Sequence, residues 1–260
     1  MFRERLLTGQ VALVTGGGTG IGFGVASQLA RCGADVVVAS RKPEHIEPAA
    51  ARLREHGVRA LPVGVNVREP DSVRAMVEHA AEEFGRIDVL VNNAAGNFYA
   101  PSADLSPKGW RAVVETDLYG TFFCSQAVYP IMARQGGGRI IAISMTLHYR
   151  GWPQMAHATA AKAGIDALTR TLALEWAPAN ITVNAIAPGP IPTEGAQRAF
   201  ATGDTSTAGI DEEMRRLIPL GRWGTPEDIG NMTVYVASPA GAWITGAVFV
   251  VDGGSSLART

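Results

Sequence analysis

Short runs of apolar residues alternate along this chain with longer segments of helical periodicity. Seven strands are expected, at 10–14, 34–39, 59–63, 89–91, 139–143, 182–187 and 248–251. Six helices are expected between them, at 20–31, 44–56, 70–84, 108–134, 157–176 and 226–237. The expected caps are Asp71 and Ser72 near the start of the third helix, and Gly33, Gly57 and Gly85 just past helix ends. The strands are continuously apolar, which is typical of a parallel sheet that is covered on both faces. The alternation therefore predicts an α/β fold with a doubly wound parallel sheet.

The chain of 260 residues contains no linker and no internal repeat, so we expect a single domain spanning residues 1–260. One irregular stretch, 188–209, is rich in Pro, Gly, Thr and Ala. A loop of that length in a compact domain is usually a lid or a binding loop. We expect a substrate lid over about residues 188–218.

The charge balance excludes several classes of protein. Lys and Arg number 23 against 24 Asp and Glu, without a basic or acidic block, which argues against nucleic-acid binding and a polybasic membrane anchor. Cys32 and Cys124 lie in apolar helical patterns, as buried thiols of a reducing compartment do. No signal-peptide core, membrane-spanning run or peroxisomal C-terminal tripeptide is present, so a cytoplasmic location is expected.

A glycine cluster directly follows the first expected strand and opens the first expected helix. Gly16 and Gly20 allow a tight turn and a close approach to a pyrophosphate, and Gly22 permits close helix–strand packing. The helix start offers free N–H groups to the anion, so Thr19 and Ile21 of the same turn are also expected to bind a cofactor. This placement favours a dinucleotide site over a merely flexible turn.

The end of the second expected strand indicates which dinucleotide is bound. A carboxylate there would bond a ribose hydroxyl and repel a 2′-phosphate, but the residues present are Ser40, Arg41 and Lys42. Ser40 can donate to a phosphate oxygen, and Arg41 can form a charge-assisted fork with it. NADP(H) is therefore expected, the alternative being a solvated helix start.

Five motifs occur in order along the chain: Thr15–Gly22, Asn92-Asn-Ala-Ala-Gly96, Lys162-Ala-Gly164, Pro188-Gly189 and Asp252-Gly-Gly254. On these motifs the chain resembles the short-chain dehydrogenases/reductases from about residue 8 to residue 254. The resemblance implies a Rossmann-type seven-stranded sheet, a nicotinamide cofactor and a homotetramer. It assigns cofactor contacts by position: Asn66 and Val67 at the adenine, Asn93 and Ala94 at the ribose, and Pro188, Ile191 and Thr193 at the nicotinamide. Asn66 departs from the aspartate that the family usually carries.

The catalytic residues of that family are largely replaced. Ala158 stands where the tyrosine of Tyr-x-x-x-Lys belongs, Met145 replaces the serine, and Asp117 replaces an asparagine. Lys162 remains, and the resemblance implies that it also binds the cofactor ribose. A ketone reductase needs an acid beside the oxygen, which alanine and methionine cannot supply. Ordinary alcohol dehydrogenase chemistry is therefore disfavoured.

With these replacements the chain resembles one subgroup of the family, the 2,4-dienoyl-CoA reductases, and their peroxisomal type in particular. The motifs concerned are Gly96-Asn-Phe98, Asp117-x-x-Gly120-Thr-Phe122, His157-Ala158 and Pro188-Gly-Pro-Ile191 followed by Thr193-Glu-Gly195. The mitochondrial type takes a tyrosine from the position of Leu147, so Tyr149, two residues on, is a candidate substitute.

The resemblance implies an NADPH-dependent reduction of an acyl thioester to a 3-enoyl-CoA. Asp117 and Lys162 are the expected catalytic residues, holding the water that protonates the α-carbon. Asn97, Phe98 and Tyr149 are the expected substrate contacts, with Asn97 or a water donating to the thioester oxygen.

Two other functions remain open at this point. One is a reductase of another conjugated or carrier-bound substrate, of the 3-oxoacyl or polyketide type. The other is a non-catalytic NADP-binding scaffold or sensor. No metal site is expected, because His45, His148 and His157 lack ligand spacing and suit surface or packing roles.

Overall fold

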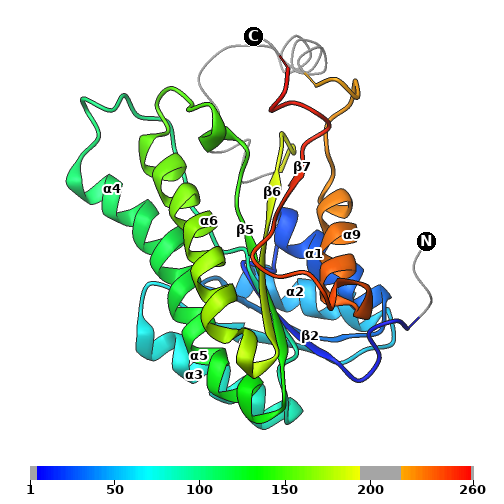
Figure 1. The fold of residues 1–260 in the computed structure, drawn as a ribbon. Helices are drawn as coiled ribbons and strands as arrows, with labels where there is room; N and C mark the ends of the chain where they lie inside the picture. The colour runs from blue at the N-terminus through cyan, green and yellow to red at the C-terminus, as the bar shows by residue number, and fades with distance from the viewer. Residues whose placement is uncertain (1–4, 194–217, 259–260) are drawn as a thin grey trace.

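The computed structural model describes residues 5–193 and 218–258. Its strands form one parallel sheet, as the sequence predicts (Figure 1). Their order in the sheet is β3-β2-β1-β4-β5-β6-β7. They are β1 (Val11–Thr15), β2 (Asp35–Ser40), β3 (Ala60–Gly64), β4 (Val89–Asn92), β5 (Gly138–Ile143), β6 (Ile181–Pro188) and β7 (Val248–Val251). The order reverses between β1 and β4, and in open α/β sheets this reversal marks the ligand crevice at the carboxyl ends of the strands.

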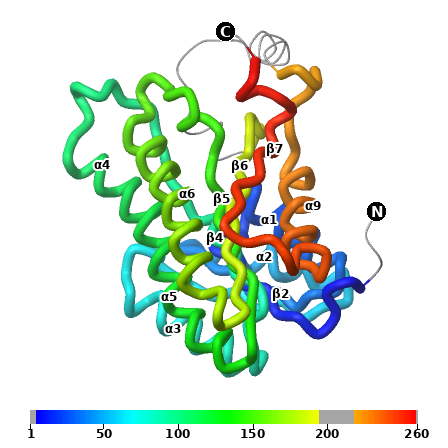
Figure 2. The backbone as a smooth tube through the Cα atoms, viewed as in Figure 1, coloured from blue at the N-terminus to red at the C-terminus, as the bar shows by residue number. Residues whose placement is uncertain are grey.

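Helices cover both faces of the sheet (Figure 2). On one face lie α1 (Gly20–Arg31), α2 (Pro43–Arg54) and α9 (Pro226–Ala237). On the other lie α3 (Pro70–Phe84), α5 (Gly120–Arg134) and α6 (Ala156–Trp176).

Side chains of one strand alternate between two hydrophobic cores, because successive residues of a strand point to opposite faces. In β1, Ala12 and Val14 enter the core under α1, α2 and α9. Val11 and Leu13 enter the core under α3, α5 and α6. Buried Cys32 and Cys124 are free thiols, as expected.

The single helix expected at 108–134 contains an irregularity. It begins as α4 (Pro107–Val114), widens into a π-helical turn at Glu115–Tyr119, and continues as α5. Thr116 and Thr121 donate from their hydroxyls to the carbonyls of Ala112 and Asp117, a side-chain bond that often bends helices. The π turn carries Asp117, and such turns are frequent at functional sites.

The helix caps are partly as predicted. Gly33, Gly57 and Gly85 follow helix ends with positive φ angles of 91°, 76° and 76°. Asp71 and Ser72 were expected near the start of α3 as caps, and this prediction is wrong, because the N-cap is Glu69 and Pro70 is the first helical residue. The Ser72 hydroxyl instead accepts from the backbone N–H of Asn66 at 3.0 Å.

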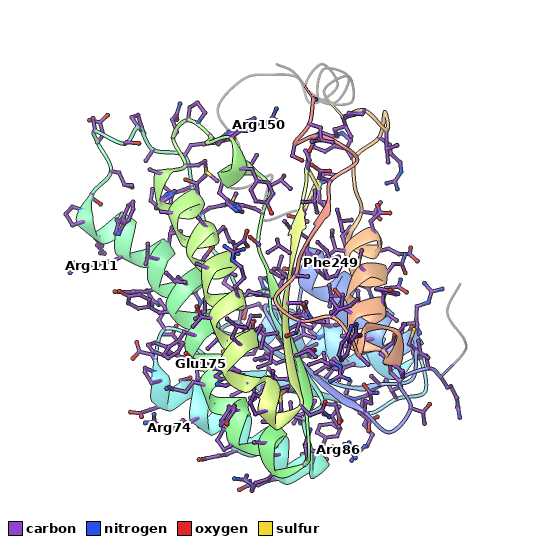
Figure 3. The ribbon with its side chains drawn as sticks, viewed as in Figure 1. Arg74, Arg86, Arg111, Arg150, Glu175 and Phe249 are labelled. Atoms are coloured by element: carbon purple, nitrogen blue, oxygen red, sulfur yellow. The ribbon has the colours of Figure 1, made fainter. Side chains whose placement is uncertain are left out.

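The chain end folds over the carboxyl edge of the sheet. Arg150, labelled in Figure 3, donates to the carbonyls of Ser255 and Ala258. The N–H of Leu220 donates to the carbonyl of Gly253 at 3.1 Å, which ties residues 218–221 to this end of the chain. Most of the expected lid at 188–218 falls on 194–217 and so lies outside the described residues. Within 5–193 and 218–258, no helix has the length and apolar character needed to cross a bilayer.

Leu53→Ala is expected to lower the free energy of unfolding by about 2–5 kcal/mol, because Leu53 of α2 is fully buried in the core and its loss leaves a cavity. The matched control is Leu174→Ala on α6, where the side chain is 81% exposed. Equilibrium unfolding in urea measures both. Equal effects of the two substitutions would contradict the assignment of Leu53 to the core.

Candidate active site

The ends of β1 and β4 are joined through Thr15, the last residue of β1. Its hydroxyl oxygen accepts the backbone N–H groups of Asn93 and Ala94, each at 3.1 Å. The Asn93 side-chain amide donates back to the carbonyls of Thr15 and Gly16 at 3.0 and 3.2 Å. Asn93 therefore fixes the glycine turn at the point where the strand order reverses. Thr15 was not predicted as a site residue, although it opens the glycine motif with a hydroxyl directly after the first expected strand.

The glycine turn has the backbone conformation that a phosphate cradle requires. Gly16 and Gly20 have φ angles of +65° and +54°, which favour glycine. A Cβ on Gly22 would lie 2.2 Å from the carbonyl oxygen of Gly16. The N-cap of α1, Thr19, makes no side-chain hydrogen bond to the helix, so the first N–H groups of α1 remain available to an anion. These residues fit a dinucleotide pyrophosphate.

The end of β2 lies against this turn, because the N–H of Gly16 donates to the carbonyl of Ala39 at 2.7 Å. Ser40 follows, and its hydroxyl oxygen accepts from the N–H of Lys42. Arg41 is exposed. His45 of α2 contacts Gly18, where an added Cβ would lie 2.9 Å from the His45 Cβ. Ser40 and Arg41 therefore stand beside the glycine turn, and their contact with a 2′-phosphate stays a prediction.

The other expected cofactor residues lie in loops at the carboxyl ends of the strands. Thr193 lies against Gly20, 3.3 Å from the place of a Cβ there, which brings the loop after Pro188 to the glycine turn. Ile191 is buried in the core on that side. The Asn66 amide bonds Arg68 and Glu69 within its own loop. The Val67 side chain packs into the core, so a contact with adenine there would use its backbone.

The expected catalytic residues Asp117 and Lys162 meet as a buried ion pair. The Lys162 Nζ lies 3.5 Å from Asp117 Oδ2 and donates to the Ile143 carbonyl at 2.7 Å. Asp117 Oδ1 accepts the backbone N–H of Gly96 at 2.9 Å. Burial raises the pKa of Asp117 above its usual value, while the Lys162 charge and the Gly96 N–H oppose this rise. A carboxylate and an ammonium in contact at a sheet edge can hold and polarise a water molecule.

Apolar side chains fill the positions of the missing family acids. Ala158 is 1% exposed and forms a small hydrophobic cluster with buried Val113 and Met155. Phe98, Tyr99 and Met145 pack against this cluster. We call these six residues the apolar wall. It contains no side chain of the acidity needed to protonate a carbonyl oxygen except the Tyr99 phenol, which contacts Trp152.

The expected substrate residues lie in two loops beyond β4 and β5. Asn97 is exposed, and the Phe98 ring packs edge-on against His157 at 4.6 Å. Tyr149 is 45% exposed, and its ring contacts that of His148 at an angle of 54°, with ring centroids 4.2 Å apart. Burial and the Asp166 charge raise the pKa of Tyr149. His148 Nε2 pairs in turn with Asp166 Oδ2 at 2.9 Å. Tyr149 is therefore engaged with the His148–Asp166 pair, and its role toward a substrate stays a prediction.

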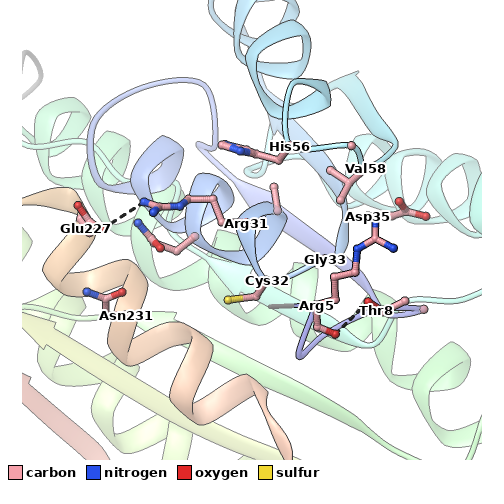
Figure 4. Close-up of a pocket in the computed structure, with 14 residues that line it drawn as sticks. Arg5, Thr8, Arg31, Cys32, Gly33, Asp35, His56, Val58, Glu227 and Asn231 are labelled. Carbon is pink, nitrogen blue, oxygen red and sulfur yellow. Dashed lines mark hydrogen bonds and ion pairs between the residues drawn. The ribbon is translucent and has the colours of Figure 1, made fainter. Parts of the chain in front are cut away.

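A separate polar cavity of about 810 Å³ lies near the amino ends of the strands, away from the glycine turn (Figure 4). Its lining includes Gly9 before β1, Asp35 at the start of β2, and the Arg31–Glu227 ion pair. Gly9 and Asp35 place this cavity at the amino ends of the strands. Because open α/β sheets bind ligands at the carboxyl ends, this cavity is not the candidate active site.

Gly22→Ala is expected to raise the Kd for a nicotinamide dinucleotide by about tenfold or more, equivalent to about 1.4 kcal/mol, because its Cβ collides with the backbone of Gly16. Fluorescence titration measures the affinity. The control is Gly64→Ala, where an added Cβ meets nothing within 4 Å. Unchanged affinity in Gly22→Ala would contradict the cradle.

Comparison with known proteins agrees with this geometry. The family described as Enoyl-(Acyl carrier protein) reductase matches residues 9–256. A peroxisomal 2,4-dienoyl-CoA reductase of Danio rerio is 44% identical over 99% of this chain and 85% of its own length. A Bacillus subtilis relative, named as a probable 2,4-dienoyl-CoA reductase that produces a (2E)-enoyl-CoA, is 37% identical over 95% of this chain and 97% of its own length. The structure of an actinorhodin polyketide ketoreductase with NADPH superposes with a TM-score of 0.91 and 34% identity, over 95% of this chain and 97% of that one. The chain belongs to the enoyl-(acyl carrier protein) reductase family of short-chain dehydrogenases/reductases, and it is an oxidoreductase.

Proposed function

We propose that this protein is an NADPH-dependent reductase of conjugated acyl thioesters that converts a 2,4-dienoyl-CoA into a 3-enoyl-CoA. The observation that carries this proposal is the buried Asp117–Lys162 ion pair beside an apolar wall at the positions of the family acids. The names of the Danio rerio and Bacillus subtilis relatives support the same substrate class.

The reaction adds a hydride to the terminal carbon of the diene and a proton to the α-carbon, and it leaves one double bond between them. When bound in this site, NADPH would supply the hydride and leave as NADP⁺. The glycine turn with the start of α1 binds the pyrophosphate, and Ser40 and Arg41 bind the 2′-phosphate. Lys162 also binds the nicotinamide ribose.

Negative charge develops on the thioester oxygen during this addition, so hydrogen-bond donors are required there. Asn97 is exposed in the loop after β4, and in this proposal it donates to this oxygen, directly or through a water. Asp117 and Lys162 hold a second water that protonates the α-carbon. The Gly96 N–H and the Ile143 carbonyl fix the two charged groups, which keeps their geometry constant during the proton transfer.

The apolar wall also separates this proposal from carbonyl reduction, which the resemblance to a polyketide ketoreductase would suggest. A ketone reductase must protonate an oxygen next to the carbon that receives hydride. Met145 and Ala158 offer no proton there.

We also propose that the protein is a homotetramer, as the family resemblance implies, and that it is located in the cytoplasm, as the sequence leads us to expect.

Purified protein is expected to oxidise NADPH with 2,4-hexadienoyl-CoA and to release a 3-enoyl-CoA. Loss of NADPH absorbance gives the rate, and chromatography of the product gives the position of its double bond. A panel of enoyl-CoA, 3-oxoacyl-CoA and free enones tests the alternatives. A 2-enoyl-CoA product would overturn the proposed regiochemistry, and binding of NADPH without turnover of any substrate would indicate a non-catalytic scaffold.

Asp117→Asn and Lys162→Met are each expected to lower kcat with 2,4-hexadienoyl-CoA by about 100-fold or more, the usual contribution of a positioned proton donor or acceptor. Asparagine retains an oxygen for the Gly96 N–H, so Asp117→Asn should keep its NADPH affinity. Asp71→Asn, an exposed carboxylate on α3, is the matched control. Undiminished rates in both site variants would exclude the Asp117–Lys162 relay.

Arg41→Ala is expected to raise the Kd for NADPH by about tenfold, the loss of one charge-assisted bond to phosphate, and to leave the Kd for NADH unchanged. Fluorescence titration with both nucleotides measures the effect, and exposed Arg74 on α3 provides the control Arg74→Ala. An equal loss for NADPH and NADH would mean that Arg41 does not recognise the 2′-phosphate.

A further inference from the structure

His157 lies in the first turn of α6, next to the Ala158 that replaces the family tyrosine. Its side chain is completely buried. The backbone N–H of Ala158 donates to His157 Nδ1 at 2.7 Å, so Nδ1 is an acceptor. In a neutral imidazole the proton must then be on Nε2. The helix start therefore selects one tautomer of this ring.

The Nε2 atom is an enclosed donor. It is buried and forms no hydrogen bond of standard geometry to the described residues. The backbone carbonyls of Met155 and Phe98 interact with the ring. The Met155 carbonyl already accepts the N–H and the hydroxyl of Thr159, at 2.9 and 3.0 Å, which occupies both of its lone pairs. The Phe98 carbonyl is the other carbonyl that faces the ring.

The same ring contacts the Phe98 side chain and faces the charge of Asp117. The Phe98 ring stands at 78° to the imidazole. Burial lowers the pKa of His157, with the Met155 carbonyl and the Asp117 charge opposing this effect. A neutral ring at physiological pH does not serve as a proton donor of the imidazolium type, but it can hold its neighbours in place.

The loop from Gly96 to Ala100 is held from both sides. The N–H of Gly96 donates to Asp117 on the π turn, as described above. On the other side, the Ala100 N–H donates to the Gln154 carbonyl at 3.0 Å, and Trp152 Nε1 donates to the Tyr99 hydroxyl at 3.3 Å. His157 contacts Phe98 between these points and also faces Asp117.

We propose that His157 is a positioning residue that fixes Phe98 against the acyl chain for the proposed reduction. This inference rests on the proposed function, since Phe98 contacts the substrate in that reaction. His157 acts through the loop and transfers no proton to the substrate.

Two variants separate the two nitrogens. Asparagine at position 157 keeps a short acceptor for the Ala158 N–H but does not reach Phe98, whereas glutamine carries its amide donor where Nε2 stands. His157→Asn is expected to raise KM for 2,4-hexadienoyl-CoA by about tenfold with kcat within about threefold, which is a loss of binding shared by ground and transition states. His157→Gln is expected to restore KM to within about threefold of the unchanged protein. The control is His79→Asn, an exposed histidine on α3.

Other outcomes overturn the inference. A fall in kcat with unchanged KM in both variants would assign His157 a direct chemical role. Unchanged kinetics in both variants, or activity lost only in parallel with melting temperature, would reduce it to packing.

Two measurements do not depend on turnover. Calorimetry with hexanoyl-CoA in the presence of NADP⁺ should show about tenfold weaker binding to His157→Asn only. Long-range proton–nitrogen spectra of isotope-labelled histidine, assigned with His157→Asn, should show an Nε2–H ring that does not titrate near neutral pH. An Nδ1–H ring or an ordinary titration would overturn the inference. If the unchanged protein fails to reduce the dienoyl-CoA while both of these results hold, the proposed function fails and the positioning of the loop stands.

Discussion

The buried ion pair between Asp117 and Lys162 constrains the rest of the site. Both side chains are almost completely withdrawn from water, and a charge in that environment is strongly destabilising unless its partner is held in good geometry. The pair therefore requires the end of β5, the first turns of α6 and the π turn to meet at one point. The Ile143 carbonyl and the Gly96 N–H occupy the remaining hydrogen-bonding positions and make the meeting point rigid.

The π turn is how a long helix brings Asp117 to that point. One extra residue in a turn rotates everything that follows by about 100° relative to a regular α-helix. α4 and α5 thus present different faces, and α5 still packs into the core while Asp117 is directed at Lys162. The first residue of α5, Gly120, has no room for a side chain, because a Cβ there would lie 2.8 Å from the Val67 Cγ2. The glycine after Asp117 is explained by close packing with the loop after β3.

The sequence predicted those parts of the structure that depend on local stereochemistry or on unbroken apolar runs. The seven strands follow from continuous burial on both faces. The glycine turn follows from the positive φ of Gly16, which favours glycine, and from the lack of space for a Cβ on Gly22. The pairing of Asp117 with Lys162 was predicted from the family motif. The π turn could not be predicted, because it is stabilised by tertiary contacts such as Gly120 with Val67. Thr15 and His157 were missed for the same reason, since each acts on a residue far from it in the chain. The cap prediction for α3 was wrong because the helix already starts at Pro70, before Asp71 and Ser72.

The Asp117–Lys162 pair and the apolar wall together suit a reaction in which hydride and proton are delivered to atoms several bonds apart. In carbonyl reduction the hydride and the proton go to adjacent atoms, so an acid must stand beside the carbon that receives the hydride. In the proposed addition to a diene the two are delivered several bonds apart, and the carbon chain between them is apolar. A hydroxyl at position 145 or 158 would be a buried polar group against that chain, which costs free energy without a partner. Ala158, Met145 and Phe98 avoid this cost, while Asp117 of the proposed relay lies on the π turn and pairs with Lys162 on α6. In the proposed reaction, the loss of the family tyrosine and the use of the Asp117–Lys162 pair to hold the protonating water are thus two parts of one change.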